Sequence, residues 1–168
     1  MADIPDIALS VRQPWAWAIV AGHKVIENRS AGSIHAGRMT CRRIAVHAAS
    51  AMKRDEYVWA VWRLEKHGVR CPAAAELVRG AIIGAVDVVD IVSESDSAWF
   101  GGQMGLVLEN AVACEPIPAK GELGYFRWEQ TDALAPPSAW MRGDGTAPLF
   151  DDLPPSFAAP PRKPFGSS

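Results

Sequence analysis

The stretch SVRQPWAWAIVAGHKVIENRS, residues 10–30, combines a polar corner, a short helix and the start of a second strand. The apolar run that leads into it, Ile7–Val11, predicts a first strand. Pro14 suits the first turn of a helix, where its missing N–H costs nothing, and Gly22 suits the helix end. The next residues, Val25–Arg29, predict a second strand. The fold therefore begins as strand, helix, strand.

The rest of the chain adds one long helix, one central strand and several shorter elements. RDEYVWAVWRLEKHG, residues 54–68, predicts a helix because Val58, Val61 and Trp62 recur at helical spacing. Ala81–Val92 is apolar on both faces and rich in β-branched residues, which is typical of a central strand. The other predicted elements are a glycine-rich connector at Ser30–Gly37, a strand at Ile44–His47, a short helix between Pro72 and Gly80, strands at 105–110 and 124–128, and a proline-containing loop at Glu115–Gly121. Short strands interrupted by helices, without regular βαβ alternation, predict an α+β fold: a small mixed, mainly antiparallel β-barrel with flanking helices.

Composition predicts one globular domain followed by a tail. The chain has 168 residues, of which 49% are hydrophobic and 21% charged, and this suffices for a single core. Prolines crowd the sequence after about residue 131 with no sustained periodicity. We therefore expect a domain at 1–130 and a proline-rich tail at 131–168 that adds no core of its own.

Net charge, cysteines and hydropathy narrow the class of protein. The formal net charge of −2 excludes neither a nucleic acid nor a small substrate. Cys41, Cys71 and Cys114 lie far apart, which favours buried free thiols over a zinc site or a disulfide framework. The amino terminus lacks a basic region, and no apolar run reaches the about 20 residues that span a bilayer. We expect a cytoplasmic protein without a membrane segment.

Lys24 and Glu27 are the candidate catalytic residues, and Arg29 beside them is a candidate binding residue that orients Glu27. Lys24 lies where the helix meets the strand, and a lysine shielded from water there can act as a base or as a cation for an oxyanion. Period-two alternation places Val25, Glu27 and Arg29 on one strand face, so the two charged side chains can pair. Structural alternatives stay open. For Lys24 the alternative is a solvated surface lysine, and for Glu27 and Arg29 it is a salt bridge that only organises the site.

Other residues are candidates for holding a ligand. Arg12 and Gln13 precede a helix amino terminus, which attracts anions, although Gln13 can instead close a turn. Trp15 is the better of the two helix tryptophans for a base-stacking role. The candidate basic face is the acid-free segment between Glu27 and Asp55, which contains Arg42, Arg43 and Lys53.

Further aromatic residues and histidines are assigned structural roles. Trp59 and Trp62 fit helix packing, and Trp99, in a glycine-bounded loop, either anchors that loop or closes over a ligand. The four histidines lack ligand spacing and no glycine-rich phosphate loop is present, so we predict no metal and no cofactor.

Four blocks in order resemble the ASCH domain family, a branch of the PUA-like superfamily. They are LSVRQPWAWAIVAG followed by Gly22-x-Lys24-x-x-Glu27-x-Arg29, then GAVDVVDIV, WFGGQMGLVLEN and EPIPAKGELGYFRW, and they span about residues 7 to 130. The resemblance implies a PUA-like barrel with a cleft lined by the Gly-x-Lys-x-x-Glu-x-Arg motif. It also implies binding of RNA, single-stranded nucleic acid or a nucleotide, with recognition of a modified base in some relatives.

Two further readings stay open beside nucleic-acid binding. The first is an enzyme centred on Lys24 and Glu27: some relatives hydrolyse N4-acetylcytidine, and ribonuclease activity is attributed to others. The hydrolases have a threonine three residues after the motif lysine, whereas this chain has Glu27. The second is a protein-interaction module that uses the tail and exposed tryptophans.

Overall fold

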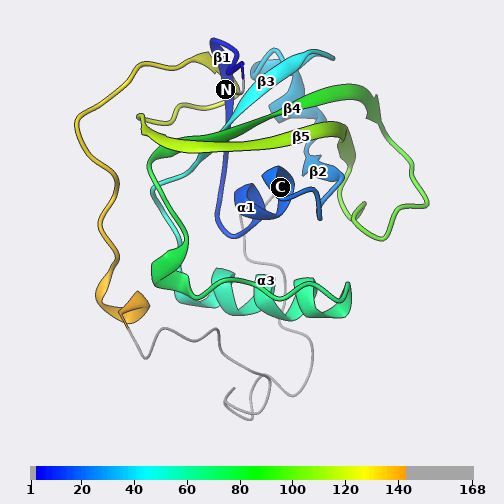
Figure 1. The fold of residues 1–168 in the computed structure, drawn as a ribbon. Helices are drawn as coiled ribbons and strands as arrows, with labels where there is room; N and C mark the ends of the chain where they lie inside the picture. Colours follow the sequence, from blue (N-terminus) through cyan, green and yellow to red (C-terminus); the bar gives the residue numbers. More distant parts are fainter. Residues whose placement is uncertain (1–2, 143–168) are drawn as a thin grey trace.

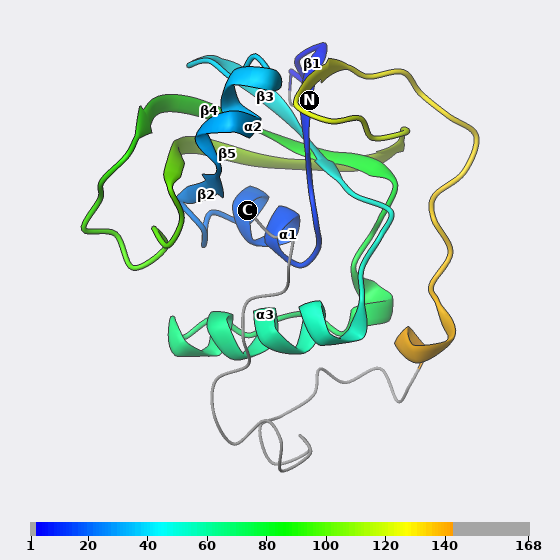
Figure 2. The same cartoon turned by 180° about the vertical axis from the view of Figure 1, so that it is seen from behind.

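The fold is a curled six-stranded sheet that wraps around a short helix (Figures 1 and 2). A computed structural model describes residues 3–142 of the chain. The strands are β1 (Ile7–Val11), β2 (Ile26–Arg29), β3 (Arg43–Ala48), β4 (Ala81–Val92), β5 (Met104–Pro118) and β6 (Tyr125–Arg127). The helices are α1 (Trp15–Val20), α2 (Ala31–Ala36) and α3 (Arg54–Lys66), with 3₁₀ turns η1 (Ala74–Glu76) and η2 (Ala139–Met141).

The sheet is mixed and mainly antiparallel, as predicted. Its strand order is β2-β5-β4-β3-β1-β6, and β1 and β3 are the parallel pair among the described strands. The sheet curls into a half-barrel whose edge strands are β2 and β6. Gly37, which follows α2, contacts the edge strand β6: its carbonyl accepts the Tyr125 N–H at 2.9 Å. The α+β prediction is confirmed.

Two hydrophobic layers position the helices. Ala16, Ile19 and Val20 of α1 are buried against β3, β4 and β5 inside the curl of the sheet. The helix α3 lies beyond α1, on the far side from the sheet (Figure 1), and buries Tyr57 and Leu64 in a second cluster. The three layers are therefore the sheet, α1 and α3, with α1 in the middle.

Three predicted segments differ from the structure. The expected connector contains the helix α2, because the Ser30 hydroxyl accepts the Ser33 N–H at 3.0 Å and caps it. The expected loop at Glu115–Gly121 is mostly strand: β5 continues to Pro118, the register partner of Ala81 in β4, and the Pro118 carbonyl accepts the Thr131 N–H at 2.8 Å. The expected helix after Pro72 is only the short turn η1.

Smaller expectations also need correction. Val25 lies outside β2 and is 43% exposed, so it does not share the buried face of Glu27. Of the three cysteines, Cys71 is buried, Cys114 is half-buried and Cys41 is exposed, so burial of all three thiols is wrong.

The first part of the predicted tail contributes to the core. Met141 is buried in the cluster of α3, and the ring centroids of Trp140 and Tyr57 lie 5.8 Å apart. The start of the tail thus packs onto the core of the domain through η2 and forms no separate core there. The rest of it, residues 143–168, lies outside the described residues.

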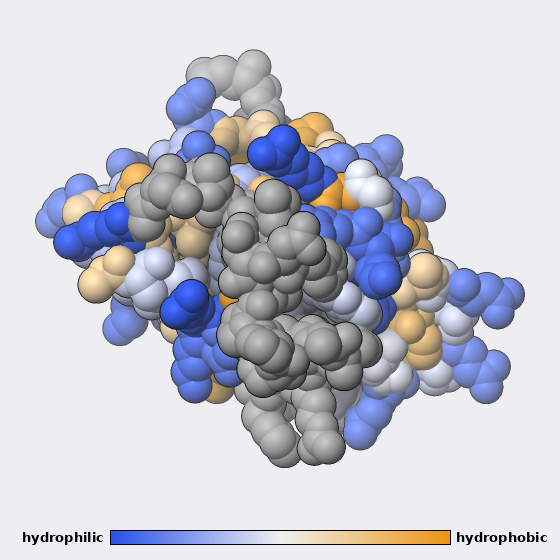
Figure 3. Space-filling model, turned by 90° about the horizontal axis from the view of Figure 1, so that it is seen from below, coloured by the Kyte–Doolittle hydropathy of each residue, from blue (hydrophilic) through white to orange (hydrophobic). Residues whose placement is uncertain are grey.

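The surface on the α3 side is mostly hydrophilic among the described residues, with scattered apolar side chains (Figure 3). No helix in the described part of the chain is long and apolar enough to cross a membrane.

Candidate functional site

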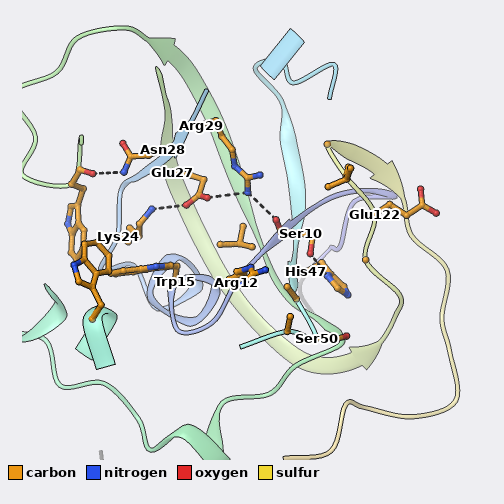
Figure 4. A pocket seen from close by; sticks show the side chains of 18 of the residues that line it. Ser10, Arg12, Trp15, Lys24, Glu27, Asn28, Arg29, His47, Ser50 and Glu122 are labelled. Carbon is orange, nitrogen blue, oxygen red and sulfur yellow. Dashed lines mark hydrogen bonds and ion pairs between the residues drawn. The ribbon is translucent and has the colours of Figure 1, made fainter. Parts of the chain in front are cut away.

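A pocket of about 820 Å³ lies where β1, α1, β2, β3 and α3 approach the loop 120–124 (Figure 4). This volume falls in the range of about 300–1,000 Å³ that small-molecule sites occupy. Trp15 and Lys24 lie at one end of the pocket in Figure 4, and Ser10, His47 and Glu122 lie at the other. The pocket therefore has an aromatic end and a polar end, which we describe in turn.

Lys24, Glu27 and Arg29 form a chain of ion pairs along the wall between the two ends. Lys24 Nζ donates to Glu27 Oε2 at 2.7 Å, and Arg29 Nη2 lies 3.1 Å from Glu27 Oε1. Arg29 Nη2 also donates to the Ser10 carbonyl at 3.0 Å, which joins the edge strand β2 to β1. The predicted pairing of Glu27 with Arg29 is confirmed, and Lys24 belongs to the same network.

Burial changes the acid–base character of Lys24. Only 6% of the residue is exposed, and Nζ donates to the Ile26 carbonyl as well as to Glu27. Loss of hydration lowers the pKa of Lys24, the Glu27 carboxylate opposes this shift, and the positive charges of Arg29 and Arg63 add to it. A lysine with a lowered pKa is closer to the neutral amine that accepts a proton, so this group can serve as a buried cation or as a base.

Three tryptophans form the aromatic end. The ring of Trp15 lies edge-on to Trp59, with centroids 5.6 Å apart, and to Trp99, with centroids 6.3 Å apart. Lys24 Nζ lies 5.8 Å from the centroid of the Trp15 ring. All three tryptophans line the pocket, and Trp59, which is only 8% exposed, also has the packing role that the sequence predicted. Such an end offers flat apolar surface to a planar ligand.

Asn28 fixes the loop that carries Trp99. Its amide nitrogen donates to the Trp99 carbonyl at 2.9 Å, and its amide oxygen accepts the Gly101 N–H at 3.0 Å. Trp99 itself is only 8% exposed and packs against His67, with ring centroids 3.8 Å apart. Trp99 is therefore held as an anchored loop residue, and its ring also borders the pocket.

Ser10 and His47 form the polar end. Ser10 Oγ lies 2.9 Å from His47 Nδ1, and His47 Nε2 lies 2.8 Å from the Ala119 carbonyl oxygen. His47 is fully buried, and desolvation lowers its pKa. Lys120 and Glu122 border this end from the loop 120–124.

Arg12 and Gln13 have different environments. Arg12 lines the pocket with 37% of its side chain exposed and forms an ion pair with Glu56 of α3. Gln13 is 2% exposed: its amide nitrogen donates to the Val78 carbonyl at 2.7 Å, and its oxygen accepts the Trp17 N–H at 2.9 Å. Both ends of the Gln13 amide thus hold α1 in place, a structural role that differs from the β-turn expected as the alternative.

Arg42, Arg43 and Lys53 do not line the pocket. Arg42 and Arg43 lie at the start of β3, whereas Lys53 precedes α3 beyond the other end of that strand. Arg43 is paired with Asp87 at 3.0 Å. A basic face built from these residues would be separate from the pocket, and it stays a prediction.

Several pocket residues were not found from the sequence as site residues. They include Ser10, Asn28, His47, Trp59, Arg63 and the loop 120–124. Asn28 had a local signal, because it lies inside the Gly-x-Lys-x-x-Glu-x-Arg motif. The others reach the pocket through long-range strand pairing and the packing of α3, which carry no local signal. Among residues 3–142, no group of three or more His, Cys, Asp or Glu side chains is arranged to hold a metal ion.

Comparison with known proteins identifies the family. The family model for the ASCH domain matches residues 9–134, which is most of the chain. The chain therefore belongs to the ASCH domain family, whose members are generally thought to bind RNA or to act on nucleic acids. Among solved structures, a serine-to-alanine mutant of the ZmASCH protein from Zymomonas mobilis is similar at 18% identity, covering 68% of this chain and 77% of that chain with a TM-score of 0.36. The search of curated proteins gave no significant match.

Proposed function

We propose that this protein binds single-stranded RNA or a nucleotide in the pocket, with a base against the tryptophans of the aromatic end. The observation that carries the proposal is the meeting of Trp15, Trp59 and Trp99 with the buried Lys24–Glu27 pair in one cavity. Stacking of a base on an aromatic side chain contributes about 1–3 kcal/mol and tolerates any base. Lys24 and Glu27 offer a donor and an acceptor beside such a base, which suits recognition of its polar edge.

The charge of the pocket supports a phosphate-bearing ligand. Five cationic residues line it against two acidic ones: Arg12, Lys24, Arg29, Arg63 and Lys120, with Glu27 and Glu122. Lys24 and Arg29 are neutralised by Glu27, and Arg12 is paired with Glu56. Arg63 and Lys120 form no ion pair within residues 3–142, so they are the cations available to phosphates.

A titration tests this proposal. Tryptophan fluorescence of the full-length protein is followed while short single-stranded RNA, or DNA of the same sequence, is added at two salt concentrations. We expect saturable quenching with RNA and an affinity that falls as salt rises, because bound phosphates release counterions. No binding at low salt would refute the proposal and favour the protein-interaction reading.

A second candidate function is hydrolysis of a modified nucleoside such as N4-acetylcytidine. The observation that favours it is the buried contact of Lys24 Nζ with Glu27 Oε2 at 2.7 Å, because a carboxylate held beside a lysine of lowered pKa can take a proton from water. Glu27 replaces the threonine of the hydrolysing relatives, so a water activated in this way would attack the acetyl carbon directly.

The hydrolase test uses wild type, Lys24→Ala and Glu27→Gln with N4-acetylcytidine and, separately, with labelled RNA. Cytidine release that both substitutions abolish would establish the hydrolase. RNA cleavage that both abolish would establish a ribonuclease at the same centre. Inactivity on both substrates, with RNA binding lost in Lys24→Ala, would leave a binding protein without hydrolytic activity.

A further inference from the structure

The polar end of the pocket carries a serine–histidine pair that the proposed binding does not use. Ser10 and His47 are register partners on the parallel strands β1 and β3, which brings their side chains together at 2.9 Å. Both line the pocket, and Figure 4 shows them away from Lys24, beyond Arg12. A hydroxyl hydrogen-bonded to an imidazole inside a pocket is the arrangement that activates a serine nucleophile.

The hydrogen bonds of His47 fix its tautomer. The Ala119 carbonyl oxygen at Nε2 can only accept, so Nε2 carries the ring proton. Burial lowers the pKa of His47, which keeps the ring neutral at neutral pH and leaves a lone pair on Nδ1. The Ser10 hydroxyl therefore donates to Nδ1. Nδ1 is thus the base, and the Ala119 carbonyl orients the ring as a third group.

The backbone at Gly121 is shaped around this pair. A β-carbon at Gly121 would lie 2.9 Å from His47 Nδ1 and 3.0 Å from Ser10 Oγ. Any larger residue would press on both reacting atoms, so only glycine lets this loop pack directly against the pair. Lys120, the next residue along the loop, is exposed and lines the pocket, so it is a cation available for negative charge that develops on a substrate.

We propose that Ser10 and His47 form a catalytic nucleophile–base pair that hydrolyses esters or other activated acyl groups on a substrate in this pocket. Because the pair lies at the polar end and uses neither Lys24 nor the tryptophans, this activity goes beyond nucleic-acid binding and does not depend on it.

The reaction has two balanced steps. In the first, Ser10 Oγ attacks the acyl carbon, His47 Nδ1 takes the hydroxyl proton, and the leaving alcohol departs with that proton. In the second, water attacks the acyl-serine ester while Nδ1 takes its proton. The proton then returns to Ser10 Oγ and the carboxylic acid is released. Water is the only co-reactant.

The test is covalent labelling of the full-length protein with a fluorophosphonate probe. Ser10 Oγ would attack phosphorus and displace fluoride, with the proton passing to His47. Intact mass counts the adducts and peptide mapping locates them. Ser50 is a matched control because it lines the same pocket, is exposed, and has no histidine partner.

We expect one adduct on Ser10 in the wild type, retained in Ser50→Ala and lost in Ser10→Ala. Labelling of His47→Gln should be slower by about 10²-fold or more, because general bases contribute about that much. The burst of p-nitrophenolate released from p-nitrophenyl acetate should follow the same order: present in wild type and Ser50→Ala, slower in His47→Gln and absent in Ser10→Ala. An unlabelled wild-type Ser10 overturns the proposal without any variant having to fold. Labelling of Ser10 at an unchanged rate in a folded His47→Gln overturns it too.

Discussion

Lys24 Nζ lies 2.7 Å from Glu27 Oε2, and the two side chains are only 6% and 9% exposed. A charged pair taken this far out of water depends on its partners, because removing one leaves the other buried and uncompensated. Arg29 makes the arrangement asymmetric: Glu27 has two cations, whereas Lys24 has one carboxylate.

This asymmetry predicts an order of stabilities. Glu27→Gln should lower the free energy of unfolding by about 3–5 kcal/mol, because it leaves Lys24 and Arg29 without a carboxylate. Lys24→Met should cost less, because Glu27 keeps Arg29. Urea unfolding of both variants at neutral pH measures the two values, and the reverse order would contradict the assignment of Glu27 as the centre of the network.

Replacing Gly121 or Gly32 by alanine should change the stability of the protein in opposite directions. Gly121→Ala places a β-carbon 2.7 Å from His47 Cε1 and should destabilise the fold by about 1–3 kcal/mol, as overpacking does. Gly32, in α2, has nothing within 4 Å of its β-carbon position, so Gly32→Ala should stabilise by about 0.5–1 kcal/mol. Denaturant midpoints of the two variants provide the comparison, and a neutral Gly121→Ala would show that the loop does not press on His47.

The buried His47 predicts a loss of stability in mild acid. Its pKa is lowered from 6.5 by desolvation, so below about pH 6.5 the unfolded chain binds a proton that the folded chain does not. Stability should therefore fall as pH drops through this window and rise as pH increases. The pKa of His67 is lowered as well, so His67 also contributes to the loss of stability in acid. The contribution of His47 is therefore the difference in this loss between wild type and His47→Gln.

The measurement is the thermal midpoint of both proteins at about pH 5 and about pH 8. The drop should be smaller in His47→Gln than in wild type. Equal drops would mean that His47 carries no pH-dependent stability and is accessible to protons in the folded state.

Lys120 should contribute to the salt dependence of RNA binding. Each phosphate contact to single-stranded nucleic acid contributes about 0.7 to the slope of log affinity against log salt. Lys120→Ala should reduce the slope by about that amount. Lys66→Ala, which removes an exposed lysine outside the pocket, should leave it unchanged. A reduced slope in Lys66→Ala and not in Lys120→Ala would place the phosphates elsewhere.

Strong local patterns made part of the fold predictable. The helix at 54–68 and the central strand Ala81–Val92 have sustained periodicity or apolar runs, and both are present as α3 and β4. The helix α2 was missed because it is short and held by a single serine cap. The end of β5 was missed because Pro116 and Pro118 are typical of a loop, whereas the pairing of this segment with β4 is a property of the whole sheet.

The site was predictable only where it is local in sequence. Glu27 and Arg29 are two residues apart on one strand, so period-two alternation indicated their pairing. The partner of Ser10 is 37 residues away, and it follows from the parallel register of β1 with β3. The role of Gln13 was ambiguous because a side-chain amide can hydrogen-bond either to a ligand or to the backbone. Its partner Val78 is 65 residues away, so no local pattern in the sequence indicated this contact.

The central claim is that RNA occupies the pocket and not the separate basic residues at the start of β3. Photo-crosslinking of a short RNA containing 4-thiouridine, followed by peptide mapping, tests it most directly. We expect crosslinks at Trp15, Trp59 or Trp99, and their loss when unlabelled RNA competes. Crosslinks confined to the peptides that contain Arg42 and Arg43, with the three tryptophans unmodified, would contradict the account.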